Sequence, residues 1–189
     1  DENACGEVVL AGPVNVGSVT DLESLAGYSH IQGDLTISVQ ASVTDLSALT
    51  SLRCVDGTLS LAGSGAVDLQ GLENLHSVWA FQVAGNEELT SFDGLNDALQ
   101  INGKENGEAD DVVIVGNPKL SAVAGFLEIA ALDTLVIEGN PALETITAFA
   151  NTAKIISVSI IDNDTLQSIA GLNGINNSSS VTLQGNDGL

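Results

Sequence analysis

Three possible metal ligands, His30, Cys54 and His76, follow one another at intervals of 24 and 22 residues in this 189-residue chain. Imidazole nitrogen and thiolate sulfur are groups that bind Zn²⁺. If the chain repeats with a similar period, His30 and Cys54 share one column and His76 lies one column away on the next repeat. A fourth ligand is missing and the spacings match no closed zinc site. We therefore interpret these residues as packing residues and predict no metal site.

A second group of possible ligands lies in a polar insertion, Asn102–Asp111. Its carboxylates are Glu105, Glu108, Asp110 and Asp111. Carboxylate oxygens suit Ca²⁺, but the spacing is not that of an EF-hand. We interpret the segment as a solvated surface loop and leave Ca²⁺ binding open; the sequence indicates no other cofactor.

The chain has two cysteines, Cys5 and Cys54, and can form one intramolecular disulfide at most. A straight alignment of repeats places them two coils apart, roughly 9–10 Å at the spacing of neighbouring strands. This exceeds the usual Cα separation of a disulfide. A terminal segment that folds back over the first coils would close the gap, so the bond stays an open alternative. If formed, it indicates an oxidising compartment.

The single tryptophan, Trp79, is predicted to face outward on a strand, either as a contact residue for a partner or as partly buried filler. No Ser/His/Asp set, phosphate-binding loop or paired-carboxylate motif stands out. We therefore predict that the chain is not an enzyme.

The elements that must position these residues follow from one repeated unit, clearest in Leu132–Leu143 (LDTLVIEGNPAL). Its asparagine recurs every 23 residues near the C-terminal end, and an internal repeat of this length indicates a solenoid. An inward-facing amide can satisfy backbone groups of two neighbouring coils. We therefore predict a structural ladder of Asn86, Asn117, Asn140, Asn163 and Asn186.

Before each asparagine the apolar residues alternate, as in Leu135-x-Ile137 and Val158-x-Ile160, which is typical of a strand with one buried face. The sequence predicts a mainly β fold: a right-handed, leucine-rich-repeat-like β-solenoid of about eight coils of about 23 residues, with parallel strands. We expect one domain over residues 1–189. Residues 1–30 are expected to form an irregular N-terminal cap and first coil, 102–111 an inserted surface loop, and 178–189 an open C-terminal coil. The Ala-rich stretch 122–132 suggests a helical turn or two.

The composition limits the partners. The net charge is −21, and Lys and Arg total only four residues. Such a surface repels nucleic acid and anionic lipid. No apolar run approaches the roughly 18 residues that span a bilayer, so we expect no membrane insertion. The chain reads as the mature part of a secreted protein after removal of a signal peptide.

The unit Leu-x-x-Leu-x-Ile-x-x-Asn resembles a leucine-rich repeat. The segments Ile31–Ile37 (IQGDLTI) and Val55–Leu61 (VDGTLSL) resemble more closely the receptor L domain, the ligand-binding solenoid of insulin and epidermal growth factor receptors, which has many bacterial relatives. The resemblance implies an extracellular, non-catalytic binding module. The chain lacks the cysteine-rich modules that flank these domains in the receptors, and no ligand-binding motif can be transferred to it.

The leading functional prediction is a secreted or cell-surface scaffold that works through protein–protein contact, either with a ligand or with copies of itself. One alternative is the subunit of an extracellular filament or appendage that assembles head to tail, because an open solenoid end exposes unpaired strand groups. A second alternative is a carbohydrate-active enzyme built on a β-helix.

Overall fold

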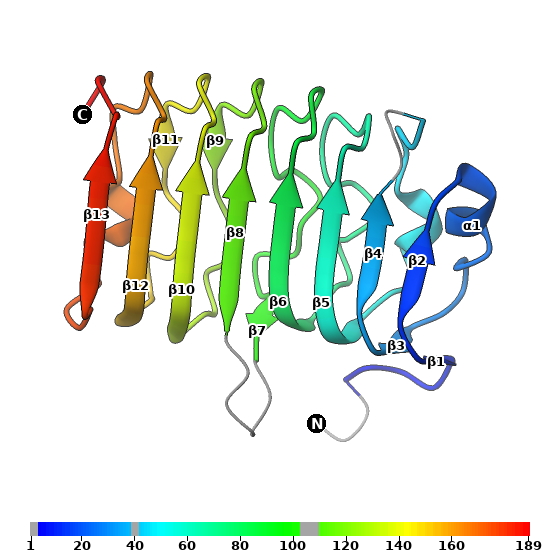
Figure 1. The fold of residues 1–189 in the computed structure, drawn as a ribbon. Coiled ribbons are helices and arrows are strands. Elements are labelled where there is room, and N and C mark those ends of the chain that lie inside the picture. The colour runs from blue at the N-terminus through cyan, green and yellow to red at the C-terminus, as the bar shows by residue number, and fades with distance from the viewer. Residues whose placement is uncertain (1–3, 39–41, 103–109) are drawn as a thin grey trace.

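The computed structural model describes residues 4–38, 42–102 and 110–189, and it shows a β-solenoid of parallel strands (Figure 1). The solenoid has about seven turns and almost no helix, in agreement with the predicted mainly β fold. The right-handed sense and the count of eight coils remain predictions.

One long parallel sheet forms a whole side of the solenoid. Its strands are β2 (Val14–Val16), β4 (Leu35–Ser38), β5 (Cys54–Ala62), β6 (Ser77–Ala84), β8 (Asp111–Val115), β10 (Ala131–Glu138), β12 (Lys154–Ile161) and β13 (Ser180–Gln184). Alternate residues in strands β4 to β12 of this sheet are buried, for example Leu135 and Ile137 in β10, whereas all residues of β13 are exposed. Because side chains alternate across a strand, one face of the sheet covers the core and the other faces solvent.

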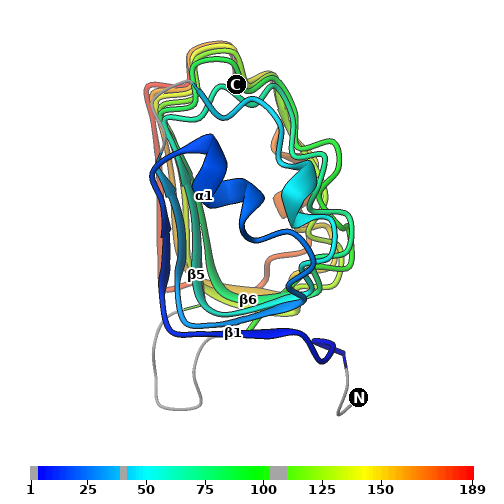
Figure 2. The same cartoon turned by 90° about the vertical axis from the view of Figure 1, so that its right-hand side faces the viewer.

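The longest strands also enter a second side of the coil, the base in Figure 2. There the first residues of β5 pair with β3 (His30–Gln32), which in turn pairs with β1 (Val9–Ala11). The first residues of β6 pair with β7 (Gln100–Ile101). The register of β5 against β6 shifts between Val55 and Thr58. This irregularity is a β-bulge, which bends a strand locally.

The third side consists of arcs with little regular structure. It contains the short strands β9 (Ala122–Val123) and β11 (Thr145–Ile146) and the 3₁₀ turns η1 (Ser47–Leu49) and η2 (Ala170–Leu172). At the start of η1, the backbone N–H of Ser47 donates to the Asp45 carboxylate at 2.7 Å, which holds the pKa of the Asp45 carboxyl below its ordinary value.

The helical turn predicted for 122–132 is wrong. Residues 122–123 pair as a strand because their backbone groups bond to the next coil.

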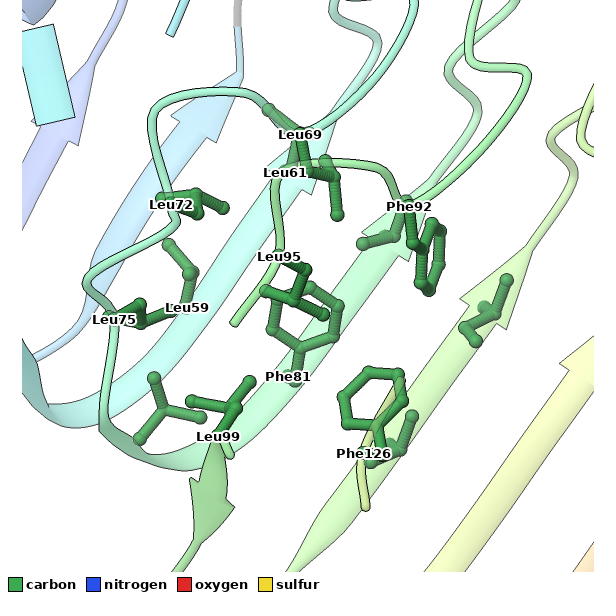
Figure 3. Packing of buried hydrophobic residues seen from close by; sticks show 14 of the residues in the cluster. Leu59, Leu61, Leu69, Leu72, Leu75, Phe81, Phe92, Leu95, Leu99 and Phe126 are labelled. Carbon is green, nitrogen blue, oxygen red and sulfur yellow. The ribbon is translucent and has the colours of Figure 1, made fainter. Parts of the chain in front are cut away.

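The interior is filled by leucine, isoleucine, valine and the phenylalanines Phe81, Phe92, Phe126 and Phe149. Figure 3 shows how Phe81, Phe92 and Phe126 lie among the leucines. Phe81 and Phe126 meet edge to face at 5.6 Å, and Phe126 stacks on Phe149 at 5.0 Å between ring centroids. The apolar step of three in the arcs brings every third side chain of a coil, such as Leu69, Leu72 and Leu75 between β5 and β6, against the inner face of the sheet.

The helix α1 (Val19–Glu23) lies across the N-terminal end of the core (Figure 2). Ser18 caps it by accepting a hydrogen bond from the backbone N–H of Asp21, and Leu22 inserts into the core with 2% of its surface exposed. Among the described residues, no helix is long and apolar enough to cross a membrane.

Candidate interaction surface

The solvent side of the long sheet is built from residues that alternate with the core positions. Strand register aligns its middle positions in one row that crosses every strand. The row is Asn15, Thr36, Ser60, Gln82, Val113, Val136, Ser159 and Thr182. It contains hydroxyls, two amides and two valines, and no ionisable group. We call the solvent side of this sheet the outer face.

Two further rows flank the middle one. The row toward the C-terminal ends of the strands is Ser38, Ala62, Ala84, Val115, Glu138, Ile161 and Gln184. The opposite row contains Thr58, Asp111, Thr134, Ser157 and Ser180. The ionisable residues beside the middle row are Asp111 on β8 and Glu138 on β10, each two residues from a valine of that row. Asp34, which precedes β4, also lies level with Thr58 and accepts a hydrogen bond from its backbone N–H at 2.8 Å. The outer face is therefore smooth, formed by small side chains and poor in charge.

The charge of the molecule lies elsewhere. Exposed carboxylates are spread over the arcs and the turns, including Asp45, Glu87, Glu88, Asp93, Asp97, Glu128, Glu144 and Asp164. The chain has 25 acidic residues and a net charge of −21. Bringing like charges together at an interface costs several kcal/mol of binding free energy. This is a large part of the total binding free energy of many complexes. The outer face is thus the side on which another molecule can approach closely without meeting many carboxylates.

The asparagines lie directly behind the C-terminal ends of these strands and fix the strand spacing. The carboxamide oxygen of Asn140 accepts from the backbone N–H and the side-chain N–H of Asn117, at 3.0 and 3.2 Å. Its Nδ2 donates to the carbonyls of Ile114 and Glu138, each at 3.1 Å. Asn163 then accepts from Asn140 in the same way.

This arrangement extends through Asn86, Asn117, Asn140, Asn163 and Asn186. The first four are fully buried. Ser64 continues the ladder into the preceding coil, because its backbone N–H and hydroxyl both donate to Asn86 Oδ1. The amides are all engaged with neighbouring coils, so they support the outer face from behind.

Cys5 and Cys54 form a disulfide, with their Cα atoms 5.1 Å apart. The N-terminal segment crosses the intervening coil, where Val8 accepts from the backbone N–H of Ser29 at 2.9 Å. Gly6 makes this path possible, because its φ is +75° and a Cβ there would collide with Ser29. A straight alignment of repeats cannot reveal such a strap, since it assumes that each residue stays on its own coil.

His30 and Cys54 are paired in register, as the column predicted, while His76 accompanies Arg53 on the following coil. The disulfide removes Cys54 as a thiolate ligand. His30 Nε2 lies 2.9 Å from Asp56 Oδ2, a charge contact when the ring is protonated, although the atoms are not aligned as a hydrogen bond. Sequence reasoning missed Asp56, two residues after Cys54, because the outward side chains of two neighbouring coils meet only after stacking.

The described residues contain no group of three or more His, Cys, Asp and Glu side chains that could hold a metal ion. Glu105 and Glu108 lie outside the described residues, Asp110 precedes β8, and Asp111 is the first residue of β8. Ca²⁺ binding stays an open alternative. Trp79 is half-buried on β6, between Val78, which pairs with β7, and Ala80, which pairs with Thr58. Its role as a contact residue also stays a prediction.

Comparisons of the chain with protein-family models, with curated proteins and with solved structures found no match.

Proposed function

We propose that this protein is a non-catalytic, extracellular or cell-surface scaffold that binds another protein through the outer face. The observation that carries the proposal is the scarcity of ionisable residues in three aligned rows, and their absence from the middle row, in a protein with a net charge of −21. An interface depleted of charge at its centre is typical of protein–protein contacts.

Two further observations support the proposal. The Cys5–Cys54 disulfide is characteristic of secreted and surface-exposed proteins. The solenoid shape and the segments Ile31–Ile37 and Val55–Leu61 fit the resemblance to the receptor L domain, whose members bind ligands outside the cell.

The proposal can be tested with labelled protein on intact cells of the producing organism. Val136→Glu places a charge in the middle row, between Val113 and Ser159. Ala124→Glu adds the same charge at an exposed position on the arcs. We expect saturable binding that Val136→Glu weakens at least tenfold and Ala124→Glu leaves unchanged.

Equal binding by the two variants would contradict the assignment of the outer face. Hydrolysis of a glycan by the purified protein would instead support the carbohydrate-active alternative. The head-to-tail filament remains a prediction.

A further inference from the structure

The geometry points to a second copy of this chain as a partner of the outer face: we infer that two molecules pack face to face into a dimer. This inference rests on the proposed function, since it names one partner for the same surface.

The first argument is electrostatic. Any contact between two copies must overcome the repulsion between molecules with a net charge of −21. Contacts through the arcs would bring residues such as Glu87, Asp93 and Glu144 against one another. Face-to-face packing through the outer face instead separates the two acidic sides and brings fewer carboxylates into the contact, among them Asp111 and Glu138.

The second argument is the shape of the outer face. Its middle row carries side chains no larger than glutamine, and the coils lie almost behind one another when viewed along the solenoid (Figure 2). Two such sheets can approach at about the 10 Å that separates packed sheets. The valines and alanines then lose contact with water, while the threonines and serines can bond across the interface.

The third argument is the available area. The eight aligned strands span about 34 Å at the usual strand spacing, and five residues along the longer strands β5 to β13 span about 16 Å. Their product, about 550 Å² for each copy or about 1,100 Å² for both, is an upper limit because β2 and β4 are shorter. This area is close to the roughly 1,000 Å² that a specific interface needs, and it fits a reversible dimer of low affinity.

A two-fold axis relates equivalent patches in such a dimer. If the whole outer face is used, the axis passes close to its centre, between Gln82 on β6 and Val113 on β8. Val113 of one copy therefore lies close to Val113 and Gln82 of the other. This position offers a direct test.

The experiment is sedimentation equilibrium of the purified protein over a wide concentration range, in 50 and 500 mM NaCl. We expect a monomer–dimer equilibrium whose dissociation constant falls about threefold or more at high salt, because salt screens the repulsion between the copies. A basic protein bound to the acidic arcs would show the opposite salt dependence.

Two charge variants examine the contact itself. Val113→Glu and Val113→Lys should each be monomeric alone, and their equimolar mixture should recover a heterodimer. Ala124→Glu, which makes the same change in net charge on the arcs, should dimerise like the unmodified protein. Circular dichroism of each variant checks that the fold is kept, since Val113 points to solvent and is half-buried.

The inference is overturned if the unmodified protein stays monomeric up to about millimolar concentration at both salt levels. It is also overturned if the mixed variants do not recover the dimer, or if open-ended polymers form. A monomer that still binds cells in a Val136-dependent manner leaves the proposed function standing. If the unmodified protein dimerises but shows no Val136-dependent binding to cells, only the proposed function is contradicted.

Discussion

At the scale of single residues, the buried asparagines determine how one coil meets the next. Each carboxamide replaces the hydrogen bonds that backbone groups would otherwise make with water at the turn after the strand. The side chain of Asn140 contacts both adjacent coils. A buried donor or acceptor that loses its partner costs about 1–3 kcal/mol.

Asn140→Ala removes the acceptor of Asn117 and the donor to Ile114 together. We expect the free energy of unfolding to fall by about 2–4 kcal/mol, measured by urea denaturation. Asn151→Ala is the matched control, because exposed Asn151 also donates to a carbonyl of the preceding coil, at 3.0 Å to Leu127. It should cost less than about 1 kcal/mol. Equal losses would show that the ladder is not a special source of stability.

At the scale of elements, neighbouring arcs approach closely enough to exclude a single methyl group. Gly94 has a φ of +91°, and a Cβ at this position would overlap the backbone of Gln70 on the preceding coil. Gly63 has a φ of +64°, but a Cβ there meets nothing within 4 Å. An alanine substitution at each glycine therefore separates the cost of the backbone conformation from the cost of the collision between coils.

Gly63→Ala should destabilise the protein by about 1–2 kcal/mol, the usual cost of a left-handed conformation for alanine. Gly94→Ala adds the collision and should cost at least about 2 kcal/mol more. Thermal unfolding of the two variants measures the difference. Similar melting temperatures would indicate that the arcs can move apart easily.

The N-terminal strap is a second element whose contribution can be measured. The disulfide joins residues 49 positions apart, and closing such a loop in the unfolded chain stabilises the native state by about 2–4 kcal/mol. Cys5→Ser combined with Cys54→Ser should lower the free energy of unfolding by that amount. Adding dithiothreitol should destabilise the unmodified protein but not the double variant. A response of the double variant to dithiothreitol would contradict this explanation.

At the scale of the whole molecule, stability is opposed by the repulsion among 25 acidic residues that only four Lys and Arg residues offset. The exposed Lys119–Glu88 pair illustrates how little compensation the surface offers, since exposed ion pairs contribute about 0–1 kcal/mol. Raising NaCl from 20 to 300 mM should therefore increase the melting temperature by about 3–5 °C, as screening weakens the repulsion.

CaCl₂ at matched ionic strength is the control for this measurement. Screening alone predicts a rise similar to that in NaCl. A much larger rise at low millimolar Ca²⁺ would indicate a specific calcium site and favour the alternative left open for Asp110, Asp111 and the adjacent glutamates. A fall in melting temperature with NaCl would show that attractive ion pairs dominate.

The sequence alone determined the parallel solenoid, the phase of its strands and the position of the asparagine column. All three depend on local periodicity, because side chains alternate in a strand and each coil buries the same kinds of side chain and backbone group. The sequence pattern therefore assigns Leu135, Ile137 and Asn140 to the core side, where the structure also places them.

Only the tertiary structure decided which residues from different coils meet. The path of the N-terminal strap depends on Gly6, and the His30–Asp56 contact depends on stacking two coils that no local pattern connects. The outer face is the clearest case. Within their own strands, no local pattern marks Thr36, Gln82 and Val136 as parts of one surface. They become one charge-poor surface only because strand register places them in a single row.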